Sequence, residues 1–210
     1  GKPAEARVTV VELAPAMTDP ARRWFALRDD PRLTVRHEDA RAFLNRQRDQ
    51  YDLVFVDVFN SHYAVPFQMG TREAAAALRR AVAPGGVMLM NVISAVEGPD
   101  GRLFQSIFKA LEQSFAEVRV YCAGGEAPDR LQNLMVAAFP ERRDAVEANP
   151  EARAEAVVVA GSVAAEKAPG AVDLSTMLAS RYTGPITFAT PALTDDFAPV
   201  ERYTLVLLRQ

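Results

Sequence analysis

The chain has 210 residues, of which 49% are hydrophobic and 24% are charged, a composition typical of an ordinary soluble globular protein with one sizeable core. Its formal net charge of −3 and the interspersed acids and bases argue against a general nucleic-acid binder. The single cysteine, Cys122, excludes an intramolecular disulfide.

The distribution of apolar residues predicts that this segment makes no membrane contact. No apolar run approaches the roughly 20 residues that a membrane-spanning helix needs. The first ten residues are charged and then strand-like, without the pattern of a signal peptide. One cysteine is also compatible with a reducing compartment. We therefore expect a cytoplasmic protein.

The first part of the chain alternates predicted strands and helices. Residues 7–12 have the pattern of a buried strand that ends in an acid, and residues 33–37 that of a short strand followed by Asp39. Helices are expected over residues 20–27 and 40–47. Strands that alternate with helices predict an α/β fold with a mostly parallel sheet and helices on both of its faces.

A predicted strand–helix–strand unit in the middle of the chain is the most informative stretch. Residues 53–56 are four consecutive apolar residues, which predicts a strand covered on both faces. That strand stops at Asp57, and a helix is expected to begin at Thr71. The motif Pro84-Gly85-Gly86 is expected to end the helix and turn the chain into a second buried strand at residues 87–92.

The remaining elements close the predicted sheet. An amphipathic helix is expected over residues 103–115 because its apolar residues share one face. Residues 118–122 and 134–139 are predicted strands that could pair antiparallel, so we expect a terminal antiparallel strand. A small helix is expected over residues 174–182.

Three acids follow three successive predicted strands: Glu12, Asp39 and Asp57. The carboxyl ends of strands in an open α/β sheet form the edge where ligands bind. We expect the three carboxylates to converge on one crevice that suits a nucleoside or a cationic substrate. Any one of them alone could equally be a solvated acid at a strand end.

Several short motifs at these positions are shared with one class of fold. They are Val11-Glu12-Leu13, His37-Glu38-Asp39-Ala40, Tyr51-Asp52-Leu53-Val54-Phe55-Val56-Asp57 and Ala83-Pro84-Gly85-Gly86-Val87. They resemble the successive motifs of the class I S-adenosylmethionine-dependent methyltransferase fold, which is Rossmann-like. Within this class the chain is most similar to the spermidine synthase (polyamine aminopropyltransferase) family. The features that favour this family are the loop over residues 57–66, Thr71-Arg72-Glu73 and the tail over residues 193–201.

The resemblance implies a transferase of polyamine biosynthesis. It implies transfer of an aminopropyl group from decarboxylated S-adenosylmethionine to a polyamine or another amine, leaving methylthioadenosine. Glu12 would bind the ribose, and Asp39 with Ala40 would hold the adenine. Asp57 would deprotonate the attacking amine, because a carboxylate can both hold an ammonium group and take its proton. No metal is expected, because no spacing of His, Cys and Asp resembles a metal site.

Four further residues are candidates for contact with the substrate. Asn60 and Tyr63 lie in the loop after Asp57. Asp195 and Asp196 would attract a polycation if the tail folds back over the site. A turn or a helix cap is an alternative explanation for this acidic pair.

The sequence departs from the family pattern in two ways. Typical synthases begin the loop with Asp-x-x-Asp, but here Asp57 is followed three residues later by Asn60, which brings no negative charge. The affinity for a cationic substrate should therefore fall. The glycine-rich loop and the first strand, which is central in this fold, do not occur ahead of residue 7. Their absence would leave strand edges and an apolar face uncovered.

We therefore expect residues 1–210 to be one incomplete catalytic domain of a longer protein, in which residues 140–190 vary within the family. A small-molecule S-adenosylmethionine-dependent methyltransferase is an alternative, because it would use the same nucleoside pocket with another acceptor. A catalytically silent nucleoside- or polyamine-binding domain is the alternative outside the enzymes, favoured by Asn60. A small-molecule amine is the expected partner, with no nucleic acid, and a homodimer is a possible assembly.

Overall fold

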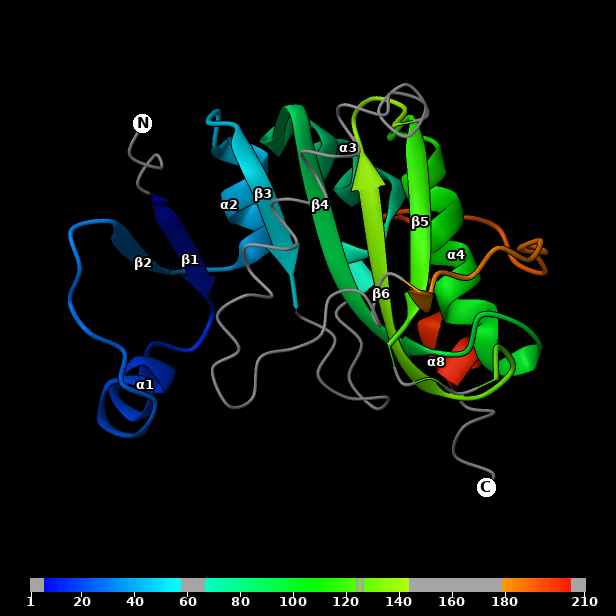
Figure 1. Cartoon of the computed structure of the whole chain (residues 1–210), viewed down its shortest axis with the longest axis horizontal. Coiled ribbons are helices and arrows are strands. Elements are labelled where there is room, and N and C mark those ends of the chain that lie inside the picture. Colours follow the sequence, from blue (N-terminus) through cyan, green and yellow to red (C-terminus); the bar gives the residue numbers. More distant parts are fainter. Residues whose placement is uncertain (1–5, 58–66, 124, 126, 144–178, 205–210) are drawn as a thin grey trace. The chain divides into compact units, whose positions relative to one another are not determined.

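The structure is a computed structural model that describes residues 6–57, 67–123, 125, 127–143 and 179–204. The chain divides into two compact units, Gly1–Arg48 and Asp49–Gln210 (Figure 1). The expectation that residues 1–210 form one incomplete catalytic domain stays a prediction.

The first unit contains a two-stranded parallel sheet and two short α-helices. Val8 lies opposite Leu33 and Glu12 opposite His37, so both strands end at the same edge. The predicted helix at residues 20–27 is shifted and shorter, because Ala26 adopts a left-handed backbone conformation (φ 56°) just after the helix end. The elements are β1 (Val8–Glu12), η1 (Pro15–Met17), α1 (Thr18–Trp24), β2 (Leu33–His37) and α2 (Ala40–Arg46).

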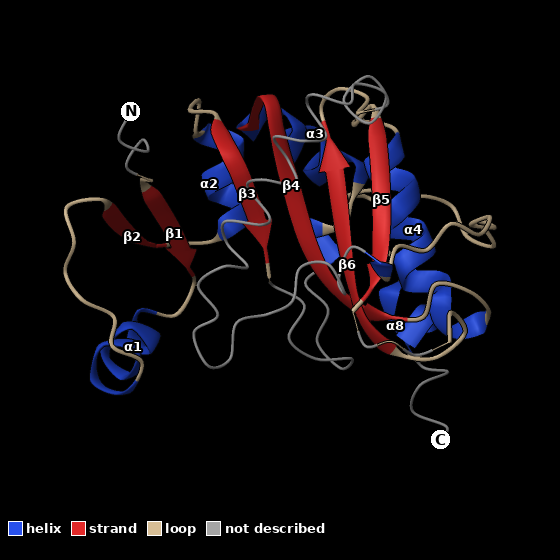
Figure 2. Ribbon diagram, in the orientation of Figure 1, coloured by secondary structure: helices blue, strands red, loops and turns tan. Residues whose placement is uncertain are grey.

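The second unit is built on a four-stranded sheet with the order β3-β4-β6-β5 (Figure 2). β3 and β4 are parallel, while β6 runs antiparallel to both β4 and β5. β3, β4 and β5 therefore share one direction, which confirms the predicted mostly parallel sheet with one antiparallel strand. That strand, β6, is the last of these strands along the chain and lies between β4 and β5 in the sheet. The elements are β3 (Tyr51–Val56), η2 (Phe67–Met69), α3 (Arg72–Ala81), β4 (Val82–Ser94), η3 (Pro99–Gly101), α4 (Arg102–Glu112), β5 (Glu117–Cys122), β6 (Gln132–Phe139) and α8 (Val200–Thr204).

The motif Pro84-Gly85-Gly86 does not end α3, as the sequence predicts, but lies inside β4. The helix ends at Ala81, and β4 begins at the next residue, which pairs with Tyr51. The register then shifts between Tyr51 and Leu53, so the motif forms an irregularity in the parallel pair. A Cβ atom at Gly86 would lie 2.8 Å from the Asp52 carbonyl oxygen, which is why glycine fits there.

The core lies between the sheet and the helices α3 and α4, which pack on one of its faces. Alternate residues of β4 point into it, and Met88, Met90 and Val92 are fully buried. Phe104 of α4 and Leu78 of α3 fill the space against them. Each such side chain contributes on the order of 1.5–3 kcal/mol through burial.

The other face of β3 is exposed, so the prediction of a strand covered on both faces is wrong for the described residues. Side chains alternate along a strand, and Val56 points into the core. Leu53 and Phe55 point the opposite way and are 54% and 55% exposed. The apolar residues of β3 would allow both of its faces to be buried. Which face is covered depends on the helices and strands that pack against it.

Residues 180–182 run along the outer edge of β5. Arg181 forms an antiparallel bridge with Tyr121, and the Tyr182 N–H donates to the Val120 carbonyl at 2.9 Å. The predicted helix over residues 174–182 is therefore wrong at its end, and residues 174–178 lie outside the described residues. This pairing satisfies the edge groups of β5 that would otherwise be open to another strand.

Candidate functional site

Asp57, the residue just after β3, and Asn91, inside the last third of β4, form a polar pair. Val56 lies opposite Met90, so the next residues of the two strands are neighbours. The Asn91 Nδ2 atom donates a hydrogen bond to Oδ1 of Asp57 at 3.0 Å. The Asp57 side chain is exposed. The structure thus places the predicted catalytic carboxylate at the sheet edge where α/β proteins bind ligands.

Asn91 is not among the residues that the sequence motifs indicate, although the sequence contains a signal for it. Asn91 is a polar residue within the apolar run of β4, between the fully buried Met90 and Val92. Its position level with Asp57 depends on the register of β3 against β4. That register contains a shift near Leu53, which a residue count along the sequence does not reveal.

The arrangement of this pair suits the binding and deprotonation of a cation. The Asn91 amide holds the Asp57 carboxylate through a single hydrogen bond. It uses one oxygen and adds no positive charge that would neutralise the acid. A carboxylate has about four acceptor sites, so Asp57 can still accept a hydrogen bond from an ammonium group.

The acidic tail folds back onto the first turn of α3. The Thr71 hydroxyl donates to Oδ1 of Asp195 at 2.6 Å, and the Asp195 N–H donates to Oε2 of Glu73 at 3.0 Å. The Arg72 N–H also donates to the Leu193 carbonyl at 2.8 Å. Although burial acts to raise it, backbone hydrogen bonds at Glu73 and from Asp195, together with Arg72, hold the pKa of Glu73 below its usual value.

The predicted substrate contacts of the tail and the loop stay predictions. Thr194 and Phe197 close a turn with two backbone hydrogen bonds, which matches the alternative expectation of a turn. The Asp195 side chain accepts a hydrogen bond from Thr71, the N-cap of α3, while Asp196 is exposed in the same turn. Asn60 and Tyr63 lie outside the described residues, since the structure does not describe residues 58–66.

The predicted nucleoside-binding acids cap local backbone in the first unit. Oε1 of Glu12 accepts from the Ala14 N–H at 2.8 Å, just after β1. Asp39 is the N-cap of α2, and its Oδ1 accepts from the Ala42 N–H at 2.8 Å. Ala40 is the first residue of that helix. Glu12 is the last residue of β1 and Asp39 follows β2, and the two strands end at one edge. The roles of these acids towards ribose and adenine, and their convergence with Asp57, stay predictions.

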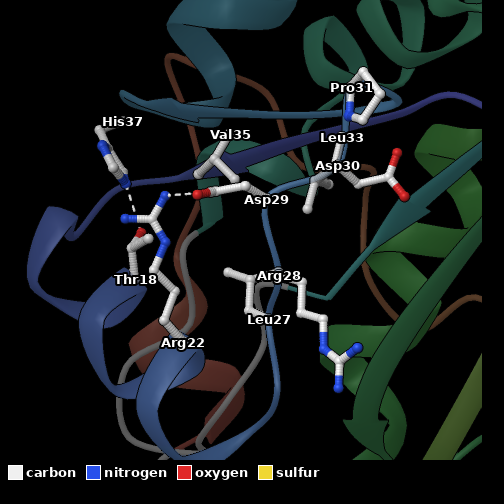
Figure 3. A pocket seen from close by; sticks show the side chains of 10 residues that line it. All are labelled: Thr18, Arg22, Leu27, Arg28, Asp29, Asp30, Pro31, Leu33, Val35 and His37. Carbon is white, nitrogen blue, oxygen red and sulfur yellow. Dashed lines mark hydrogen bonds and ion pairs between the residues drawn. The ribbon is translucent and has the colours of Figure 1, made fainter.

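The first unit also contains a pocket of about 500 Å³ between α1, the following loop and β2 (Figure 3). Arg22 pairs with Asp29 at 3.0 Å, and the Thr18 hydroxyl and the His37 ring nitrogen lie 2.7 Å apart. Neither Glu12 nor Asp39 lines this pocket, so it does not coincide with the predicted nucleoside site. Its walls are Thr18, Arg22, Leu27, Arg28, Asp29, Asp30, Pro31, Leu33, Val35 and His37.

The described part of the chain holds no group of three or more His, Cys, Asp and Glu side chains that could bind a metal ion. Cys122 is buried at the end of β5, and burial raises the pKa of its thiol. This makes it a structural rather than a reactive cysteine. Among the described helices, none combines the length and the apolar character needed to cross a bilayer.

Comparison with solved structures defines the class of fold. A probable spermidine synthase from Corynebacterium glutamicum aligns with a TM-score of 0.57 and 26% identity over 65% of this chain and 48% of its own. Human methyltransferase-like protein 13 in complex with SAH aligns with a TM-score of 0.59 and 17% identity, over 87% of this chain and 76% of its own. A spermidine synthase in complex with the transition state analogue AdoDATO aligns with a TM-score of 0.56 and 17% identity, over 95% of this chain and 60% of its own. The chain therefore has the class I S-adenosylmethionine-dependent methyltransferase fold.

Sequence relatives confirm the more particular resemblance to polyamine aminopropyltransferases. A probable polyamine aminopropyl transferase of Bifidobacterium longum is 36% identical over 114 residues, covering 53% of this chain and 23% of the relative. Polyamine aminopropyltransferase 1 of Streptomyces coelicolor is 37% identical over 112 residues, covering 50% of this chain and 21% of the relative.

A methyltransferase is also among the relatives. The eEF1A lysine and N-terminal methyltransferase homolog of Drosophila pseudoobscura pseudoobscura is 28% identical over 138 residues, covering 58% of this chain and 20% of the relative. The chain thus spans less than a quarter of the length of each of these three relatives. No protein-family model matches the chain.

Proposed function

We propose that the chain carries the acceptor-activating part of an enzyme that transfers an aminopropyl group from decarboxylated S-adenosylmethionine to an amine such as a polyamine. The observation that carries this proposal is the exposed Asp57 carboxylate at the carboxyl end of β3, held at one oxygen by Asn91. The polyamine aminopropyltransferases among the relatives support this choice of reaction.

Asp57 acts as the base in this proposal. An alkylamine of pKa near 10 is protonated at neutral pH and must lose a proton before it can attack. The amine nitrogen then bonds to the propyl carbon next to the sulfonium, and the carbon–sulfur bond breaks with its electron pair going to sulfur. The products are methylthioadenosine and the extended amine, and the released proton passes to Asp57.

The proposal includes the nucleoside contacts that the sequence resemblance implies. Glu12 would bind the ribose hydroxyls, and Asp39 with Ala40 would hold the adenine. On the acceptor side, Asn60, Tyr63, Asp195 and Asp196 are the proposed substrate contacts. A cytoplasmic location, a homodimer and the absence of a nucleic-acid partner stay predictions.

Methyl transfer from S-adenosylmethionine is the second candidate. The methyltransferase homolog among the relatives favours it. The neutral Asn60 in place of a second acid also weakens the case for a polycationic acceptor. The two reactions leave different products, because aminopropyl transfer yields methylthioadenosine and methyl transfer yields S-adenosylhomocysteine.

Product analysis of the purified chain tests the proposal. The chain is incubated with decarboxylated S-adenosylmethionine or S-adenosylmethionine and with putrescine or spermidine, and the nucleoside products are quantified. We expect methylthioadenosine, with the rate at least about 100-fold lower in Asp57→Asn because the base is lost. The matched control Asp129→Asn, an exposed acid in a turn, should keep the wild-type rate.

Each other outcome has a clear meaning. S-adenosylhomocysteine as the product would replace aminopropyl transfer by methyl transfer. The absence of both products would contradict the proposed function. Calorimetric titration with methylthioadenosine, in wild type and in Asp39→Ala, then tests whether a nucleoside site is present without catalysis.

A further inference from the structure

We propose that Asn91 is a positioning residue, which fixes the orientation of the Asp57 carboxylate for proton transfer. The inference rests on the proposed function and adds a role that neither the relatives nor the sequence motifs assign. Its starting point is the 3.0 Å hydrogen bond from Asn91 Nδ2 to Asp57 Oδ1.

The two residues differ in how firmly the fold holds them. Asp57 follows the last residue of β3, an edge strand of its sheet, and its side chain is exposed. The final torsion of an aspartate side chain is broad, so a solvated carboxylate samples many orientations. Without a partner, Asp57 would spend only part of its time in the orientation that reaches an amine.

Asn91 lies on a strand that is held on both sides. β4 pairs with β3 on one edge and with β6 on the other, and Asn91 itself lies opposite Met135. Its chain neighbours Met90 and Val92 are fully buried. The core and the two neighbouring strands therefore hold the Asn91 backbone in place. Its side-chain amide projects from this fixed backbone on the opposite face and holds the Asp57 carboxylate through the hydrogen bond.

The chemical nature of Asn91 also fits this role. Its N–H group orients the carboxylate through a hydrogen bond and carries no charge of its own. A lysine or arginine at this position would orient the acid but would neutralise the charge that attracts a cationic acceptor. An apolar residue would keep the charge but leave the carboxylate free to rotate.

A double-mutant cycle tests the inference in the full chain. The four proteins are wild type, Asn91→Leu, Asp57→Asn and the double variant, assayed for methylthioadenosine formation. We expect Asn91→Leu to lower kcat about 10-fold with little change in KM for the nucleoside substrate. In the Asp57→Asn background the same substitution should have no further effect, because the carboxylate it positions is already absent.

The control variant is Asn133→Leu, an exposed asparagine on β6 of the same sheet, which should retain the wild-type kcat. If Asn91→Leu fails to fold, as judged by circular dichroism, Asn91→Ala takes its place in the cycle. An equal loss of kcat in both backgrounds would overturn the positioning role while leaving the proposed function intact. A wild-type chain without aminopropyl transfer would instead overturn the proposed function and this inference with it.

Discussion

Ion pairs and hydrogen bonds of single residues set how the second unit responds to pH. Glu117 on β5 accepts from Arg119 Nε at 2.6 Å and from the Arg143 N–H at 2.7 Å, and the Glu117 side chain is 16% exposed. Although burial acts to raise it, these hydrogen bonds and the positive charges of Arg119 and Arg181 hold the pKa of Glu117 below its usual value. A depressed carboxyl pKa stabilises the fold above the unfolded-state pKa, near 4.3, and this stabilisation is lost as the pH falls.

We expect Glu117→Gln to lower the free energy of unfolding by about 1–2 kcal/mol at pH 7, because charged hydrogen bonds are lost. The difference from wild type should shrink as the pH falls below about 4, where the wild-type carboxyl also becomes neutral. Urea unfolding at a series of pH values measures this. Glu141→Gln, at an exposed position of the same unit, serves as the control and should show no such dependence. A pH-independent difference would contradict the assignment.

At the scale of elements, α3 connects the candidate site to the tail. Its N-cap Thr71 accepts from the Ala74 N–H at 3.2 Å and donates to Asp195. One hydroxyl therefore both caps the helix and holds a segment that lies more than 120 residues later in the chain.

We expect Thr71→Val to lower the free energy of unfolding by about 1–3 kcal/mol, because it removes both the cap and the donor to the tail. Asp195→Ala should cost less, because the cap remains. Thermal unfolding compares the two, with the exposed Thr183→Val as the control. Equal losses in the two variants would mean that capping contributes little.

The same Asp195→Ala variant separates the two roles considered for the tail. A rise in KM for the amine acceptor would support direct contact between the carboxylate and the substrate. An unchanged KM with a lower unfolding free energy would mean that Asp195 only stabilises the start of α3.

At the scale of the whole molecule, apolar side chains remain exposed in both units. Val8 and Val10 of β1 are 49% and 40% exposed, and Leu53 and Phe55 of β3 are exposed by more than half. Exposed apolar surface of this kind favours association with another apolar surface.

We expect the isolated chain to self-associate, and the double variant Leu53→Thr with Phe55→Thr to reduce this association with a small change in stability. Threonine retains the preference for a strand while adding a polar group. Analytical ultracentrifugation measures the association, and urea unfolding measures the stability. Val56→Thr, on the buried face of the same strand, should instead destabilise by about 1–3 kcal/mol. A similar loss of stability in both variants would show that Leu53 and Phe55 are buried in solution.

Local sequence patterns were sufficient to predict the order and type of most elements, the strand end at Asp57, the start of α3 after Thr71 and the resemblance to the aminopropyltransferases. These properties are local, because side-chain periodicity, capping residues and short motifs are written in neighbouring residues. Only the tertiary structure placed Asn91 beside Asp57, Asp195 against Thr71 and the Pro84-Gly85-Gly86 motif within β4. The physical reason is that strand register and the docking of distant segments depend on packing between parts of the chain whose contacts no local pattern records.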